Sequence, residues 1–231
     1  MTATQPVPAT PYTPPPVSPT RPPGRAWAWT GLAGALVGVP GLMLTGNTYD
    51  ASTGVVEDND ALLAAVTGSA GLVWAQQVVC AVAATCLLVF AAGLHRSLAR
   101  QEPAGSLVPG LAAAGLVVTA GALLVGGGIC TELYWALAGD QPFDPDTVGA
   151  HLALYNTLPW LWGALGVSAA AVAVGGFRNG SVGRPIAVLS AVLAVLLAAS
   201  QVLPVQYVAV LPGGTWVAVT ALSAALGRRR A

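Results

Sequence analysis

The sequence has little charge, no lysine and few aromatic residues, and these absences exclude most kinds of soluble protein. Charged residues make up 8% and aromatic residues 6% of its 231 residues, whereas about a quarter of a soluble domain is charged. All nine basic residues are arginine, a bias that fits a bacterium with a GC-rich genome. Because so little charge cannot cover a surface in water, we expect lipid to be the solvent for most of the chain.

Motifs for several chemistries are absent as well. The net charge is zero, and no basic face with interleaved aromatic residues could hold nucleic acid. The three cysteines form no C-x-x-C motif, which excludes thiol exchange, and we expect small buried thiols in helices. The acidic loops lack the glycine and terminal glutamate of an EF-hand. We therefore predict no metal, no cofactor and no catalytic residue.

Long hydrophobic segments are what the sequence does contain. Hydrophobic residues make up 55% of the chain and the mean hydropathy is +0.70. Six segments have close to the roughly 20 residues that a helix needs to cross hydrocarbon: 27–46, 70–94, 107–131, 150–176, 185–204 and 206–227. An N-cap at Asp58 or Asn59 would start the second one earlier. The pattern predicts an all-α, polytopic membrane protein with six transmembrane helices over residues 27–227, and Gly34 and Gly38 form a G-x-x-x-G packing motif in the first.

The arginines predict the orientation of these helices. All nine fall on one side of a six-span arrangement, and seven of the nine acidic residues fall in or at the edge of the opposite loops. By the positive-inside rule the arginine side is cytoplasmic. We therefore expect a multi-pass protein of the inner (cytoplasmic) membrane, with both termini, including the basic residues 228–231, in the cytoplasm.

Residues 1–26 form a proline-rich tail. Nine of the eighteen prolines lie within the first 23 residues, which predicts a disordered, extended cytoplasmic segment without a core. P-x-x-P spacings within it suit a cytoplasmic partner with a proline-binding groove, whereas a plain spacer is the alternative.

Polar side chains are expected to gather in the outer third of the bundle. Glu132 lies roughly 37 Å along its helix from the inner end, beyond a hydrocarbon core of about 30 Å. Pro40, Pro159 and the glycines of residues 126–128 interrupt helices in the same region, as in membrane proteins with water-accessible sites. We predict a small outward-facing polar cavity for a lipid or small ligand from the extracytoplasmic side. Its candidate ligand-binding residues are Gln76, Gln77, Glu132, His151, Tyr155, Asn156, Gln201 and Gln206.

Glu132 and His151 are the two ionisable members of this set. The loop between their helices is short, so the two side chains could pair at the outer ends of antiparallel neighbours. Such a pair would act as a proton-responsive element or a ligand anchor. The alternatives are a purely structural interhelical pair, or two solvated groups of the kind that any membrane interface carries.

The segment layout, with "TELYWAL" (131–137) and "HLALYNTLPWLWG" (151–163), resembles a group of bacterial, actinobacterial-type six-helix integral membrane proteins of unknown function. The resemblance covers residues 27–227. It implies a fold, and no catalytic residue can be carried over from it.

The preferred function is that of a non-enzymatic membrane protein with an accessory, sensing or scaffold role. A small transporter or channel is the first alternative, although no charged residue lies near the midplane, where coupling ions need partners. A membrane enzyme that uses Glu132 and His151 is the second. It lacks a further histidine or a Ser-x-x-Lys pairing.

Overall fold

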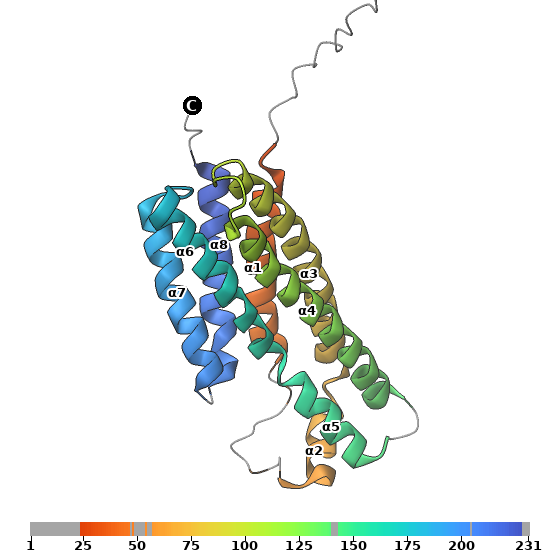
Figure 1. Ribbon diagram of the computed structural model, residues 1–231. Helices are drawn as coiled ribbons and strands as arrows, with labels where there is room; N and C mark the ends of the chain where they lie inside the picture. The colour runs from red at the N-terminus through yellow and green to blue at the C-terminus, as the bar shows by residue number, and fades with distance from the viewer. Residues whose placement is uncertain are drawn as a thin grey trace, which may run out of the picture.

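The computed structural model of the protein describes residues 24–46, 48, 54, 57–139, 143–203 and 205–227. Within these ranges the regular structure is entirely helical (Figure 1), as predicted. The helices are α1 (Ala26–Thr45), α2 (Asn59–Val66), α3 (Ala70–Ala99), α4 (Val108–Ala138), α5 (Pro145–Tyr155), α6 (Leu165–Asn179), α7 (Arg184–Val202) and α8 (Val210–Leu226), with 3-10 helices η3 (Leu158–Ala164) and η4 (Gln206–Ala209) before α6 and α8. Residues 1–23 of the predicted tail and the basic residues 228–231 lie outside the described part.

Five helical segments are long and apolar enough to cross a membrane. They are α1, α3, α4, the run from α5 to α6, and α7, whereas α8 is apolar but shorter, with 17 residues. Aliphatic side chains face outward along them: Leu36, Val125 and Val195 are 62%, 66% and 68% exposed. Helices that are apolar on all faces suit lipid rather than water. These features indicate a protein embedded in a membrane.

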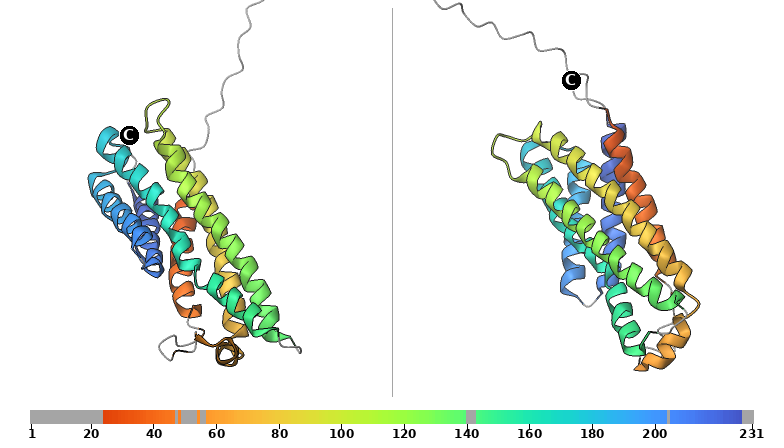
Figure 2. Two further views of the ribbon diagram at one scale, coloured as in Figure 1. Left: turned by 60° about the horizontal axis from the view of Figure 1, so that its bottom comes forward. Right: turned by 90° about the vertical axis from the view of Figure 1, so that its right-hand side faces the viewer.

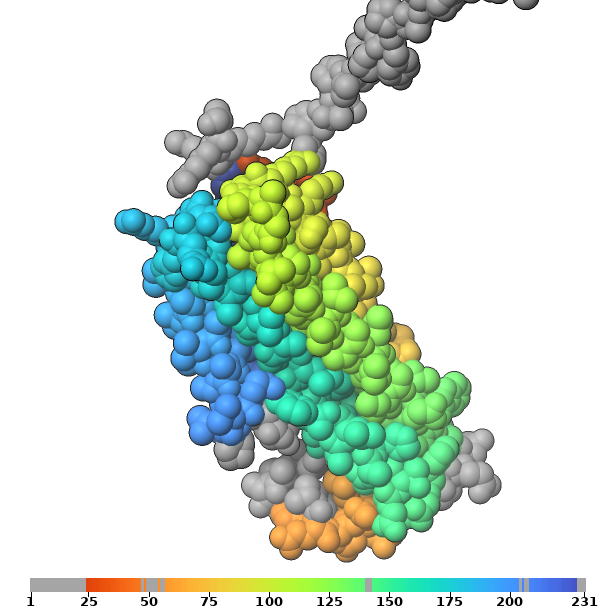
Figure 3. Space-filling view, viewed as in Figure 1, coloured from red at the N-terminus to blue at the C-terminus, as the bar shows by residue number. Residues whose placement is uncertain are grey.

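The helices form an elongated bundle with two distinct ends. α3 and α4 are antiparallel neighbours, α1 packs against α3 and α8, and α6 packs against α7 and α4 (Figures 1 and 2). At one end, Nη1 of Arg25 donates to the carbonyl oxygen of Ala225 at 2.8 Å. We call this the arginine end, because it carries the described arginines, which are Arg25, Arg96, Arg100, Arg178 and Arg184. The other is the α2–α5 end, where these two helices protrude beyond the rest (Figure 3).

Several boundaries differ from those predicted. α3 continues to Ala99 rather than 94, and the fourth long segment starts at Pro145 rather than 150. Residues 59–66 form a separate helix, α2, whose N-cap Asp58 accepts a hydrogen bond from the amide of Asp60 at 2.9 Å. It does not extend the second long helix, because the chain turns at Thr67 and Gly68 before α3 starts at Ala70. α4 continues to Ala138 rather than ending near residue 131. The apolar sequence continues there, and no glycine or proline stops the helix until Gly139.

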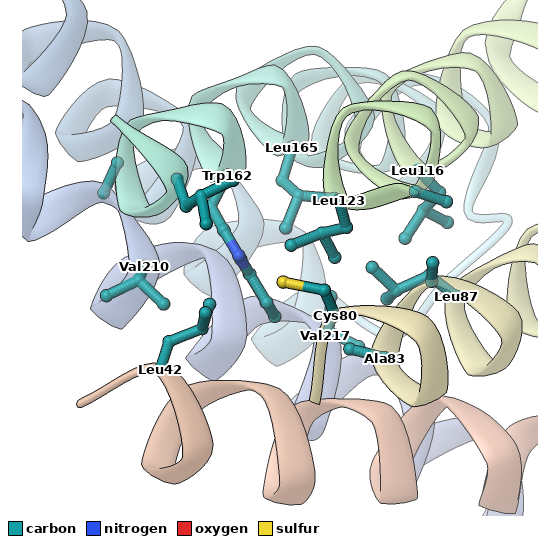
Figure 4. Packing of buried hydrophobic residues seen from close by; sticks show 14 of the residues in the cluster. Leu42, Cys80, Ala83, Leu87, Leu116, Leu123, Trp162, Leu165, Val210 and Val217 are labelled. Atoms are coloured by element: carbon teal, nitrogen blue, oxygen red, sulfur yellow. The ribbon is translucent and has the colours of Figure 1, made fainter. Parts of the chain in front are cut away.

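The core is built from small residues facing large ones. A Cβ atom on Gly34 would lie 2.8 Å from Cβ of Cys86, and one on Gly38 would lie 2.9 Å from the ring of Trp162. Both glycines of the G-x-x-x-G motif therefore serve helix packing, as predicted. Figure 4 shows the Trp162 ring among aliphatic side chains from several helices, with the sulfur of Cys80 pointing towards it.

Candidate functional site

The α2–α5 end is held together by local caps and one link between helices. Asp144 caps α5 by accepting a hydrogen bond from the amide of Thr147 at 3.1 Å, and Pro145 begins the helix. Proline suits this position because the first amides of a helix have no internal partner. Nδ2 of Asn59 on α2 donates to Oδ1 of Asp146 on α5 at 2.7 Å. The two short helices therefore pack as a pair beyond the ends of the long helices.

Three polar side chains meet where α5 ends. Oγ1 of Thr45 and the hydroxyl of Tyr155 lie 2.7 Å and 2.8 Å from the Gln76 side-chain amide oxygen. The Tyr155 hydroxyl also lies 2.7 Å from the Thr45 carbonyl oxygen, and Oγ1 of Thr45 lies 2.7 Å from that of Gly41. All three side chains are buried: Thr45 is 7% exposed, Gln76 is 2% exposed and Tyr155 is 1% exposed. This Thr45–Gln76–Tyr155 network joins α1, α3 and α5.

Proton counting indicates how the network is satisfied. Each hydroxyl carries one proton, so Thr45 and Tyr155 together cannot donate along all four contacts. The two ends of an amide are assigned from their hydrogen bonds. With the amino group of Gln76 turned towards the hydroxyls, Gln76 donates to both, Thr45 donates to Gly41, and Tyr155 donates to the Thr45 carbonyl. Each of these four contacts then has one donor and one acceptor.

The network lies at a break in the fourth long segment. After Tyr155 the chain leaves α-helix and forms the seven-residue 3-10 helix η3 before α6 continues. Pro159 lies in its first turn and has no amide hydrogen to donate. Long 3-10 stretches within a helix often mark a hinge or a strained segment. η3 also carries the buried Trp162, whose indole N–H has no hydrogen-bond partner among the described residues.

Two buried thiols lie below the network. Cys80 of α3 and Cys130 of α4 are both fully buried, form no disulfide and lie next to each other. Cys86 is half-buried. The prediction of small buried thiols in helices is confirmed for Cys80 and Cys130, but not for Cys86.

The structure does not bring Glu132 and His151 together. Glu132 is exposed on α4, whereas Nδ1 of half-buried His151 lies 2.8 Å from the carbonyl oxygen of Thr147 on its own helix. Among the described residues no ion pair joins these two side chains, so the pairing that the sequence allowed is not formed. The reason is helical phase: α4 buries Cys130 and Leu133, and at about 100° per residue Glu132 falls outside that buried face.

The other predicted residues divide into three groups. Gln76 and Tyr155 meet in the network, and Gln77 and Asn156 are half-buried beside them in sequence. Gln201 is exposed on α7, with its amide against Gly163 of η3. The backbone of Gln206 lies in η4, and its side chain is outside the described part.

Thr45 is a network residue that was not predicted, because a threonine in an apolar helix usually bonds the carbonyl of its own preceding turn, as Thr45 does with Gly41. Its place at the outer end of the first long segment was the signal that could have found it.

The cavities described lie at the arginine end rather than beside the network. The larger has a volume of about 620 Å³ and the smaller about 410 Å³. Glu102 lines the smaller one, and its Oε2 accepts hydrogen bonds from Ser106 at 2.8 Å and Asn179 at 2.6 Å. These bonds tie the α3–α4 loop to the end of α6.

The charge of Glu102 is favoured by these contacts. Partial burial raises the pKa of its carboxyl group, but the nearby Ser181 hydroxyl and the hydrogen bonds from Ser106 and Asn179 outweigh it and lower the pKa. The Ser181 hydroxyl lies near the carboxylate but forms no hydrogen bond with it. Among the described residues, Oγ of Ser181 and Oε1 of Glu102 both have no hydrogen-bond partner.

Within the described ranges, no group of three histidine, cysteine, aspartate or glutamate side chains is placed to hold a metal ion. No family model, curated protein or solved structure matches the chain. Statements about its function therefore rest on the residues and contacts described above.

Proposed function

We propose that the chain is a six-span protein of the cytoplasmic membrane with both termini in the cytoplasm. η4 and α8 have 4 and 17 residues, and together they extend roughly 33 Å, enough for a sixth crossing of a hydrocarbon core of about 30 Å. The five described arginines share one end of the bundle, which supports a cytoplasmic arginine end. The resemblance to a bacterial family and a cytoplasmic partner for residues 1–26 stay predictions.

We further propose a non-enzymatic, sensing role for the α2–α5 end. The observation that carries it is the buried Thr45–Gln76–Tyr155 network at the break between α5 and η3. A lipid or small ligand bound to α2 and α5 from the extracytoplasmic side would move Tyr155. Opening the network would leave Gln76 unpaired in an apolar setting, which is costly. Movement at this end is thereby coupled to η3 and Trp162 inside the bundle.

The contacts favour sensing over the two alternatives. An enzyme built on Glu132 and His151 needs the two groups together, and they are apart. In α3 and α4, the charged residues of the described chain lie close to the helix ends, whereas transporters of charged solutes usually place partners at mid-membrane.

A ligand-free coupling experiment tests the proposal. The chain is placed in lipid nanodiscs, and amide hydrogen exchange is followed by mass spectrometry over residues 145–164. Asn59→Ala, which removes the link between α2 and α5, is expected to speed exchange in η3 by at least about threefold, because the loosened pair pulls on Tyr155. In the Tyr155→Phe background the same substitution should leave η3 unchanged. Asp60→Asn, on exposed α2 surface, is the matched control.

Two results would count against the proposal. Faster exchange in α5 alone, with η3 unaffected by Asn59→Ala, would show that the network is structural and would refute the sensing proposal. An effect on η3 that persists without the Tyr155 hydroxyl would refute the assigned route.

A further inference from the structure

The larger cavity at the arginine end is formed by segments far apart in the chain. Its walls come from the start of α1, the ends of α3 and α8, and the turn at residues 180–183 before α7. Figure 2 shows the ends of α1 and α8 side by side at this end. The volume of about 620 Å³ falls within the range of pockets that hold small ligands.

The charge of this cavity is of one sign. Arg25, Arg96 and Arg100 line it, and no acidic residue is among the described residues of its wall. Neutral donors come from hydroxyl groups such as those of Ser97 and Ser223. Such a wall attracts an anion, and arginine donates to phosphate through two parallel N–H groups.

Two of these arginines have no partner within the described chain. Arg25 uses one N–H to bind the Ala225 carbonyl and so closes the end of α8, which leaves other guanidinium donors free. Arg96 and Arg100 are exposed and take part in no described hydrogen bond or ion pair. They are four residues apart at the end of α3, where Arg100 is the C-cap, so they lie on the same side and repel each other. An anion between them would relieve that repulsion.

The start of α7 contributes in the same sense. Its N-cap is Gly183, which has no side chain to bond the first amides, and both Gly183 and Ile186 line the cavity. The positive end of the helix dipole therefore adds to the field of the arginines.

The remaining wall is apolar. The Trp27 ring stacks on Phe90, with 5.8 Å between ring centroids, and lies against Gly93. Leu94, Leu98 and Ile186 complete this side. An arginine-rich cavity with an apolar wall, at the end of lipid-facing helices, suits a ligand with a charged head and a hydrophobic body.

We propose that this cavity binds the phosphate group of an anionic phospholipid from the leaflet at the arginine end. Arg96 and Arg100 hold the phosphate, and the Trp27 side of the wall packs against the glycerol and the first carbons of the acyl chains. The site is independent of the sensing role proposed for the opposite end.

Lipid counting on the full chain tests this site. The protein is purified in detergent, stripped of bound lipid and titrated with dioleoyl phosphatidylglycerol or dioleoyl phosphatidylcholine, and native mass spectrometry counts the lipids on each molecule. Arg96→Gln combined with Arg100→Gln removes two lining charges. Arg178→Gln combined with Arg184→Gln removes two charges from the same end outside the lining. Ser223→Trp fills the cavity without changing its charge.

We expect the first phosphatidylglycerol to bind at least about tenfold more weakly to the Arg96/Arg100 double variant, because two charge-assisted contacts are lost. Ser223→Trp should show a similar loss, and it decides the matter if the double variant does not fold. The Arg178/Arg184 control should change by less than about threefold, and phosphatidylcholine should bind weakly throughout.

Three results would overturn the proposal. Equal losses in both double variants would mean that only the general positive charge of this end attracts lipid. Equal binding of phosphatidylglycerol and phosphatidylcholine would mean that the site does not recognise the negative charge of the lipid. Saturable binding of inorganic phosphate that displaces phosphatidylglycerol would make this a site for a soluble phosphate rather than for a lipid.

Discussion

Trp162 shows at the scale of one residue how this bundle is packed. Its ring is fully buried, and the space for it is created by the missing side chain of Gly38 on α1, where a Cβ would lie 2.9 Å from the ring. In lipid there is no hydrophobic force between apolar helices, so such close contacts provide much of the association energy. A larger residue at Gly38 or a smaller one at Trp162 would therefore disturb the packing of the two helical segments.

This matching predicts a large difference between two glycine-to-alanine substitutions. Gly38→Ala should destabilise the protein by about 1–3 kcal/mol, since a rigid ring must move to accept the methyl group. Gly121→Ala on α4, where a Cβ would meet nothing within 4 Å, should cause no loss because alanine favours helix. Unfolding in mixed micelles by titration with a denaturing detergent measures both. Equal stability of the two variants would show that the Gly38–Trp162 contact contributes little.

At the scale of elements, the α3–α4 loop is fastened by the charge of Glu102. Its carboxylate accepts hydrogen bonds from Ser106 in the same loop and from Asn179 at the end of α6. Because the pKa of Glu102 is lowered in the folded protein, its contribution to stability is fully present above the ordinary value of 4.5. It is lost as the pH falls through the lower folded value.

Glu102→Gln keeps an acceptor and removes the charge, so it isolates this contribution. We expect the variant to be less stable than the parent by about 1 kcal/mol or less at pH 7, since the group is partly exposed and screened by solvent. The difference should shrink to nothing as the pH is taken below the folded pKa. Thermal unfolding in detergent from pH 7 to pH 3 measures it. A difference that stays constant with pH would mean that the charge of Glu102 does not matter.

For the whole molecule, the positions of the long helices along the chain could be predicted from the sequence, but their rotation about each helix axis could not. Apolar length located five helical segments that could cross a membrane and the shorter α8, and proline at position 159 marked the region where α5 gives way to η3. In water a buried face is revealed by its contrast with a polar face. In lipid both faces are apolar, so nothing in the sequence showed that Gln76 contacts Tyr155 or that His151 contacts its own helix rather than Glu132. The short helix α2 was missed because its eight residues look like the start of the next apolar run.

The orientation of the molecule in the membrane is the prediction on which most of the others depend. If the arginine end is cytoplasmic and η4 with α8 makes a sixth crossing, Asp60 and Leu203 lie outside the cell and Gly227 inside. In a background where the three natural cysteines are replaced by alanine, Asp60→Cys and Leu203→Cys should react with a membrane-impermeant maleimide on intact cells. Gly227→Cys should react only after the cells are opened. Labelling of Leu203→Cys and Gly227→Cys from the same side would mean that α8 does not cross. In that case, labelling of Asp60→Cys on intact cells would still support a cytoplasmic arginine end, whereas the sixth crossing would be refuted.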